Sequence, residues 1–242
     1  MSYLFNIILK IIDFFYQKKI INFFKKTSAL SYDVVVDIGA HKGETISNFL
    51  KNFKIQNIYS FEASSKTYKD LESNVKKIRK KYTTVNIEIF NTGIGNSKDQ
   101  KIFNELPDSN SSTFNMIDEN SSYFKRKNKI LSFFFKKKFI IKKNFVSQIK
   151  LSEFIKEKKI KNIDILKIDT EGYEFEVIKG LDKDIKIIKF IYFEHHYDNM
   201  IKKNYKFSDI HDFLSTNGFQ RAFKVKMPLR KSFDYIYEKK NV

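Results

Sequence analysis

Cysteine and tryptophan are absent from the chain, and only seven glycines and two prolines occur among its 242 residues. Without cysteine there can be no disulfide framework, no thiolate metal site and no cysteine nucleophile. The scarcity of glycine and proline excludes collagen-like and low-complexity classes. No uncharged apolar run of about 18 residues is present, so we expect no transmembrane helix. No small-residue cleavage site follows a basic start, so we expect no signal peptide.

Positively charged side chains outnumber negatively charged ones in this sequence. The formal net charge is +18, and nearly all of the excess is lysine because the chain has only four arginines. Arginine is the side chain that reads phosphates and base edges bidentately. We therefore favour a solvated lysine surface over a dedicated polyanion site. The length and the 42% hydrophobic content suit one α/β domain with a large core.

The first 30 residues have a character of their own. Residues 3–26 are mostly apolar, but Lys10 and Asp13 interrupt them and lysine pairs follow. Two interpretations stay open: an amphipathic helix that lies on a membrane surface, or a helix that packs on the adjacent domain or holds a partner subunit. We favour the second. We assign residues 1–30 to an N-terminal amphipathic helical segment and residues 31–242 to the main domain.

Strands and helices alternate through the main domain. Runs typical of buried strands lie at 33–39, 57–62, 85–90, 163–169 and 189–194. Segments with helical spacing separate them, which is the pattern of a doubly wound, mostly parallel α/β sheet. Two final runs, at 219–225 and 233–238, predict an antiparallel pair at the end of the sheet. An insertion at about 97–150 breaks the alternation, and we expect it to be partly hairpin and to shape a ligand site.

A glycine-containing turn, Asp37-Ile-Gly39-Ala-His-Lys-Gly43, follows the first expected strand. In doubly wound folds this turn binds nucleotide-like cofactors. Neither the dinucleotide fingerprint nor a P-loop is met, which argues against a diphosphate cofactor. Glu62 ends the second strand, where an acid accepts hydrogen bonds from ribose hydroxyls. The two features together predict a ribose-bearing cofactor without a phosphate clamp.

Acidic residues and histidines end two later strands. Asp169 and Glu171 follow the strand at 163–169, and a helix dipole explains Glu171 but not Asp169. Glu194, His195 and His196 end the next strand, and alternation sends the two histidines to opposite faces. The histidine in the cleft is open to two interpretations, a general base or a metal ligand. We assign no metal ligand, because a metal would want more ligands, although Asp169 could join.

The motifs D-I-G-A-H-K-G-E-T, F-E-A and L-K-I-D-T-E-G-Y-E, in this order, resemble those of the FkbM family of S-adenosylmethionine-dependent methyltransferases. The resemblance covers about residues 33–194. It implies an α/β, Rossmann-like class I methyltransferase fold: a mostly parallel seven-stranded sheet with an antiparallel last strand and helices on both faces. It also implies S-adenosylmethionine as cofactor and, most often, O-methylation of sugars and natural products.

The resemblance also assigns residues to the cofactor. The methionine part would be held by Asp37, Gly39, Ala40, His41 and Gly43. Glu62 would hold the ribose, Gly93 and Ile94 would flank the adenine, and Asp169 and Glu171 would lie at the methyl-transfer centre. His41 stands where the family often has asparagine, and Ala63 where proline is common.

A hydroxyl acceptor is weakly acidic, so a base near the attacking oxygen helps. The candidate catalytic groups are Asp169, Glu171 and His195, of which only the histidine has an unperturbed pKa near neutrality. The candidate acceptor-binding residues are Ser111, Ser112, Thr113 and Glu194. We also expect the basic segment 124–143, with Lys136, Lys137 and Lys138, to border the acceptor cleft.

We therefore expect an S-adenosylmethionine-dependent O-methyltransferase of a sugar, glycan or related small molecule, in polysaccharide biosynthesis. The alternatives are a nucleic-acid methyltransferase, which we disfavour, and a non-catalytic basic, membrane-associated protein on the same fold. We expect the protein to be cytoplasmic, with the N-terminal helix as a possible peripheral contact to the inner membrane face. Metal dependence, the acceptor and the oligomeric state stay open.

Overall fold

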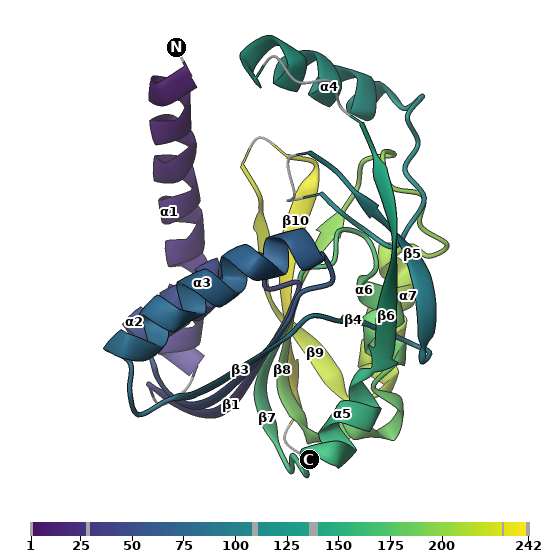
Figure 1. The fold of residues 1–242 in the computed structure, drawn as a ribbon. Helices are drawn as coiled ribbons and strands as arrows, with labels where there is room; N and C mark the ends of the chain where they lie inside the picture. Colours follow the sequence, from purple (N-terminus) through teal and green to yellow (C-terminus); the bar gives the residue numbers. More distant parts are fainter. Residues whose placement is uncertain (1, 28–29, 108–110, 136–139, 229, 241–242) are drawn as a thin grey trace.

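A computed structural model describes residues 2–27, 30–107, 111–135, 140–228 and 230–240, and within these the side chains of residues 2–14, 131 and 133–135 are left aside. The main sheet runs through the centre of the molecule (Figure 1). Its seven strands, in spatial order, are β3 (Asn86–Phe90), β2 (Lys54–Phe61), β1 (Ser31–Ile38), β7 (Ile163–Ile168), β8 (Ile188–His196), β10 (Ser232–Lys239) and β9 (Phe219–Lys226).

The strand directions confirm the expected Rossmann-like α/β fold. From β3 to β8 each neighbouring pair is parallel, whereas β10 runs antiparallel to both β8 and β9. The antiparallel strand therefore lies one place inside the edge, and β9 forms the edge itself. Parallel strands must be joined by crossovers, and the helices between them supply these.

Helices cover both faces of the main sheet. On one face lie α1 (Ser2–Thr27), α2 (Glu44–Asn52) and α3 (Ser65–Lys81). On the other lie α5 (Leu151–Glu157), α6 (Glu174–Lys179), the 3₁₀ helix η1 (Asp182–Ile187) and α7 (Phe207–Thr216). Side chains alternate between the faces of a strand. In β1, Val34 and Val36 accordingly join the core under α5 to α7, and Val35 joins the core under α1 to α3.

The N-terminal helix α1 is packed on the main domain over its second half. Ile20 and Phe24 are fully buried, and the ring of Phe24 contacts that of Phe190 on β8, with centroids 5.6 Å apart. This is the packed arrangement that we favoured from the sequence. Within the part of the chain that the structure describes, no helix has both the length and the apolar character needed to cross a bilayer.

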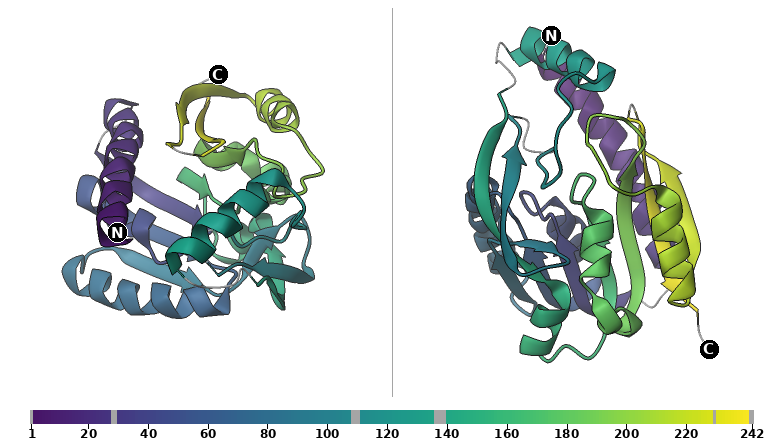
Figure 2. Two further views of the ribbon diagram at one scale, coloured as in Figure 1. Left: turned by 90° about the horizontal axis from the view of Figure 1, so that it is seen from above. Right: turned by 90° about the vertical axis from the view of Figure 1, so that its right-hand side faces the viewer.

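The insertion builds a second, three-stranded sheet. Its strands, in spatial order, are β4 (Gly93–Gly95), β6 (Lys142–Lys150) and β5 (Asp99–Glu105). Strands β5 and β6 pair antiparallel, but α4 (Ser122–Phe135) lies between them in the chain, so they are not joined by a short turn as in a hairpin. Figures 1 and 2 show α4 at the same end of the molecule as the N-terminus of α1. The insertion therefore adds a wall and a helix at this end of the main sheet.

Candidate active site

Three strand ends meet at the centre of the main sheet. The turn after β1 is tied to β2 because the backbone N–H groups of Gly39 and Ala40 both donate to the carbonyl of Phe61, at 2.9 Å each. It is tied to β7 because Asp169 N–H donates to the carbonyl of Ile38 at 2.9 Å. A Cβ on Gly39 would lie 1.9 Å from the carbonyl oxygen of Asp169, so only glycine fits this approach.

A cavity of about 690 Å³ opens at these strand ends. Its size lies within the roughly 300–1,000 Å³ range of small-molecule sites. Gln17 of α1 and Ile130 of α4 contribute to its wall, so the N-terminal helix and the insertion both border it. The residues expected to bind the cofactor that line this cavity are Gly39, Ala40, His41, Glu62, Gly93, Ile94 and Asp169.

Glu62 is held at the end of β2 by backbone donors. Its carboxylate accepts hydrogen bonds from the N–H of His41 at 2.9 Å and of Ser64 at 2.9 Å, and its side chain is nearly buried. Burial raises the pKa of Glu62 to about 7 although these two hydrogen bonds lower it. An acid fixed in this way presents acceptor oxygens to the cavity without needing a cation beside it.

Two residues expected at the cofactor do not line the cavity. Asp37 is fully buried behind the turn and lies opposite Lys167 in the β1–β7 ladder. Gly43 precedes α2 with φ +89°, and a Cβ there would lie 3.2 Å from Leu71 of α3. Neither residue therefore lines the cavity in this structure: Asp37 supports the turn from below, and Gly43 provides the backbone angle and the close helix packing.

Lys167 is a functional residue that sequence reasoning missed. Its Nζ lies 3.4 Å from Asp37 Oδ1 and 3.2 Å from Asp169 Oδ2, and it lines the cavity. Burial raises the pKa of the Asp169 carboxyl, but the nearby Lys167 ammonium outweighs it, and the net shift is downward. A charged residue inside the apolar run I-D-I-L-K-I was the available signal, since a buried lysine needs an acidic partner.

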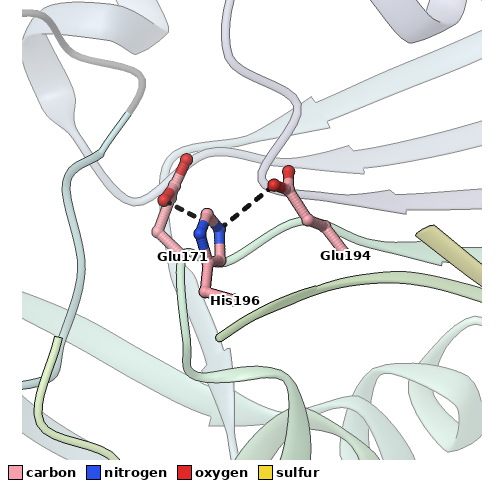
Figure 3. Close-up of side chains that lie close together, drawn as sticks. All are labelled: Glu171, Glu194 and His196. Carbon is pink, nitrogen blue, oxygen red and sulfur yellow. Dashed lines mark ion pairs between the residues drawn. The ribbon is translucent and has the colours of Figure 1, made fainter. Parts of the chain in front are cut away.

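Glu171, Glu194 and His196 converge where β7 and β8 end (Figure 3). His196 Nε2 lies 3.1 Å from Glu171 Oε2 and 3.3 Å from Glu194 Oε1, and all three side chains are buried. Burial raises the pKa of Glu194 to about 8. Burial lowers the pKa of His196, but Glu171 and Glu194 outweigh it and raise that pKa overall. Glu171 and Glu194 face the large cavity.

The structure corrects the choice of His195 as the base. His195 points to the opposite face of β8, where its ring packs against those of Tyr197, Tyr205 and Phe207 at centroid distances of 4.8, 5.9 and 5.6 Å. Burial, with the charge of Lys203, lowers the pKa of His195 to about 3. The imidazole of His195 is therefore neutral and does not line the cavity. His196 lies on the cleft side of the strand instead.

Glu171 does not cap the following helix. It lies in the left-handed region, with φ +51°, and its carboxylate faces His196. Glu174 has the local role instead, because its Oε1 accepts hydrogen bonds from Gly172 N–H at 2.7 Å and from the Thr170 hydroxyl at 3.2 Å. The local capping contacts therefore belong to Glu174, whereas the Glu171 carboxylate pairs with His196 in the cleft.

The three hydroxyl residues of the insertion separate. Ser112 lines the large cavity and Ser111 lines a smaller one, where Lys127 Nζ donates to the Ser111 hydroxyl. Thr113 is fully buried and its hydroxyl accepts from Asn115 N–H at 3.2 Å, so its role is in holding the loop. Ser111 and Ser112 remain candidates for acceptor binding, and Thr113 does not reach either cavity.

The smaller cavity, of about 200 Å³, adjoins the large one. Glu171, Lys127, Ile130 and Arg230 line both. The residues that line only the smaller cavity are Ser111, Tyr123, Arg126, His196, Asp198 and Met200. The described part of the basic segment 124–143 thus borders the cleft through α4, whereas Lys136, Lys137 and Lys138 lie outside the described residues.

Comparisons with known proteins agree with this geometry. A family model described as "Methyltransferase FkbM domain" matches residues 37–221. A search of the curated proteins found no match. Methyltransferase FkbM from Methylobacillus flagellatus KT has a similar fold, with a TM-score of 0.57, 13% identity, and coverage of 88% of this chain and 45% of that one. This chain therefore spans less than half the length of that protein.

A second solved structure extends the comparison. Magnesium protoporphyrin IX methyltransferase from Synechocystis PCC 6803, crystallised with bound S-adenosylmethionine, has a TM-score of 0.53 and 10% identity. The similarity covers 96% of this chain and 82% of that one. At these identities both likenesses describe the fold of the main domain.

Proposed function

The chain belongs to the FkbM methyltransferase family, and on this premise we propose that it transfers a methyl group from S-adenosylmethionine to a hydroxyl of an acidic, sugar-like small molecule. One observation carries the proposal: the walls of a single cavity include the ribose-type acid Glu62 and the carboxylates of Asp169 and Glu194. The cofactor and the acceptor can therefore meet in one cavity.

The cavity residues fit the cofactor. Glu62 presents carboxylate oxygens, which suit two ribose hydroxyls as donors. Ile94, Phe103 and Phe114 supply an apolar wall for the adenine beside the turn at Thr92 and Gly93. The turn formed by Gly39, Ala40 and His41 lies next to Asp169, where the methionine end belongs. Among the described residues, no cluster of basic side chains at this turn forms a phosphate site. S-adenosylmethionine contains no phosphate, so the turn suits it.

S-adenosylmethionine, when bound, supplies an activated methyl group on a sulfonium sulfur. The contribution of the chain is chiefly alignment, which can lower the barrier by several kcal/mol. The Asp169 carboxylate, fixed by Lys167 Nζ at 3.2 Å, is placed to orient the acceptor hydroxyl and to accept its proton. The N–H of Asp169 donates to the carbonyl of Ile38. This hydrogen bond fixes the distance between Asp169 and the turn that would hold the cofactor.

The smaller cavity supports an anionic acceptor. Arg126 and Lys127 of α4 and Arg230, just before β10, face it together with the Ser111 hydroxyl and the Tyr123 ring. Guanidinium groups pair well with carboxylate or phosphate, and hydroxyls suit a polyhydroxylated ligand. A volume of about 200 Å³ admits a sugar ring and not a folded RNA. A small acidic sugar therefore fits better than a nucleic acid.

Binding and turnover test the proposal separately. Calorimetric titration with S-adenosylmethionine should show binding that Glu62→Ala weakens by about 1–3 kcal/mol. Glu72→Ala, an exposed acid on α3, is the matched control and should bind like the wild type. Transfer of a labelled methyl group should then be measured to hexuronic acids, sugar phosphates, neutral sugars and RNA. Absence of cofactor binding contradicts the proposal, and methylation of RNA alone would favour the nucleic-acid alternative.

A further inference from the structure

Three potential metal ligands gather between the two cavities (Figure 3). Glu194 and His196 are two residues apart on β8 and therefore project from the same face, while Glu171 reaches them from the turn after β7. One ligand atom from each of the three lies within 4.8 Å of the others. An imidazole and two carboxylates thus meet at one point of the cleft.

The two distances from His196 Nε2 to the glutamate oxygens are of the size found in a coordination sphere. Ligand atoms about 2.1 Å from a metal ion, at angles between octahedral and tetrahedral, lie roughly 3.0–3.4 Å from one another. His196 Nε2 lies 3.1 Å from Glu171 Oε2 and 3.3 Å from Glu194 Oε1. Among the described residues, neither His196 Nε2 nor Glu194 Oε1 has a hydrogen-bond partner, although both side chains are more than nine-tenths buried.

The other ring nitrogen of His196 is held as in metal sites. Nδ1 lies 3.5 Å from Asp198 Oδ2, and Asp198 Oδ1 in turn accepts a hydrogen bond from Met200 N–H at 3.0 Å. A histidine that ligates a metal usually gives its second N–H to such a carboxylate, which leaves the first nitrogen with its lone pair exposed. With Nδ1–H given to Asp198, loss of the other proton on metal binding would leave the lone pair of Nε2 beside one oxygen each of Glu171 and Glu194.

Several carboxylates crowd this part of the cleft. Burial and the charges of Asp169, Glu171 and Asp234 raise the pKa of the Glu194 carboxyl, whereas the nearby His196 lowers it. Arg230 interacts electrostatically with Glu171 and Glu194, and all three side chains line the large cavity. Buried carboxylates persist only when they are paired or coordinate a metal. A divalent ion at the centre would meet both acids at once.

We propose that Glu171, Glu194 and His196 bind a divalent first-row metal ion, with Asp198 orienting the histidine. Mixed oxygen and nitrogen ligands without a thiolate suit Mn²⁺ or Zn²⁺ better than Ca²⁺, which takes oxygen ligands alone. Three protein ligands leave coordination positions open, as in catalytic sites rather than structural ones. The two cavities share Glu171 in their walls, so the open positions face the ligand space.

The role of the ion rests on the proposed function. The acceptor hydroxyl would bind at an open position, where the metal lowers the pKa of its proton. That proton passes to the Asp169 carboxylate. The oxygen then forms a bond to the methyl carbon as the carbon–sulfur bond breaks, and the electron pair of that bond stays on sulfur, which becomes a neutral thioether. The ion itself is neither oxidised nor reduced.

Metal binding is measured without turnover. The full chain, treated with EDTA and dialysed, is titrated with Mn²⁺, and free Mn²⁺ is followed by electron paramagnetic resonance. We expect one site with micromolar affinity, weakened at least 30-fold in His196→Gln and in Glu194→Gln. His211→Gln, a histidine on α7 that contacts Tyr237, is the matched control and should keep the affinity. Zn²⁺ should compete with Mn²⁺, and Ca²⁺ should not.

Folding and function are separated by two further readouts. Mn²⁺ or Zn²⁺ should raise the melting temperature of the wild type, a result that needs no variant to fold. S-adenosylmethionine titrations of the same variants report the cofactor site alone. No Mn²⁺ or Zn²⁺ binding below about millimolar, or equal binding in His196→Gln, overturns the metal site. Metal binding without methyl transfer leaves the site standing and contradicts the proposed function instead.

Discussion

The ammonium of Lys167 lies between two carboxylates, 3.4 Å from Asp37 and 3.2 Å from Asp169. Asp37 is fully buried below the cofactor turn, whereas Asp169 is partly exposed to the cavity. One lysine therefore neutralises an acid that has no access to water and orients another that faces the ligand. The first two predictions follow from this pairing.

Lys167→Met should destabilise the fold, because it leaves Asp37 as an unpaired buried charge. Removing one partner of a buried ion pair costs about 3–5 kcal/mol, and urea denaturation measures this loss. Lys158→Met is the control, since Lys158 pairs with Glu88 at the surface and should contribute less than about 1 kcal/mol. Adding Asp37→Asn to Lys167→Met should recover part of the loss. Equal effects of the two lysine changes would contradict the pairing.

Asp169→Asn should fold, bind S-adenosylmethionine within a few-fold of the wild type and lose kcat by about 100-fold or more. The amide keeps the backbone bond to Ile38 but cannot accept a proton. Single-turnover rates with saturating cofactor measure the effect. Asp182→Asn, at a surface acid that accepts from Ser152 and Lys150, is the control. A kcat near that of the wild type would show that Asp169 has no part in the chemistry.

Adenosine binding should depend on pH through Glu62. Because burial raises the pKa of Glu62 to about 7, its charge is present above that pH and lost below it. Ribose hydroxyls bond more strongly to the ionised form, so affinity should fall about tenfold from pH 8 to pH 6. Adenosine is used because it lacks the titrating amino group of the natural cofactor.

Glu62→Gln should bind adenosine weakly and with little dependence on pH. His41→Gln changes the histidine that lines the cavity beside Glu62, and it should keep the wild-type slope. Calorimetry at pH 6, 7 and 8 gives all three curves. A slope that disappears in His41→Gln and persists in Glu62→Gln would assign the titration to the histidine.

Arg126→Gln should raise the KM for an acidic acceptor by about tenfold and leave cofactor binding unchanged. Its guanidinium lines the smaller cavity, whereas Lys129 of the same helix lines neither cavity. Lys129→Gln is therefore the matched control. Added salt should also raise the KM of the wild type, and by less in Arg126→Gln. Equal KM values in the two variants would show that Arg126 does not bind the acceptor and that the charge of α4 is only a solvated surface.

His195→Phe should leave the pH profile of kcat unchanged and keep the rate within about threefold. The ring sits among aromatic side chains, so a similar apolar ring should cost less than about 1.5 kcal/mol in stability. Rates between pH 6 and pH 9 are the measurement. Loss of one limb of the profile would restore His195 as the base.

The sequence predicts the main sheet well, because its buried strands are short runs rich in β-branched or aromatic residues. The family match confirms the resemblance drawn from the glycine turn and the strand tips. The second sheet was harder to foresee. Most of β6 is exposed, and its lysines and asparagine do not show the apolar alternation that identifies a buried strand. Its pairing depends on β4 and β5, which are distant in the chain.

Side-chain direction at the site was only partly predictable. Glu194 was assigned to the cleft, and alternation then places His196 beside it and His195 behind, so the choice of His195 did not follow the alternation. The position of Asp37 relative to the cavity could not be read in this way. It depends on how far the turn at Gly39 to Gly43 folds over the end of β1, which is a tertiary contact.

The packing of α1 limits how the protein can be shortened for crystallisation or for fusion to other domains. A version starting at Ser31 would lose Ile20 and Phe24 from the core and uncover Phe190 on the central sheet. It would also lose Gln17 from the cavity wall, so the ligand space would change along with solubility. Among the described side chains of α1, Tyr16 is the first that is buried in this core, so trimming beyond Tyr16 would begin to remove it.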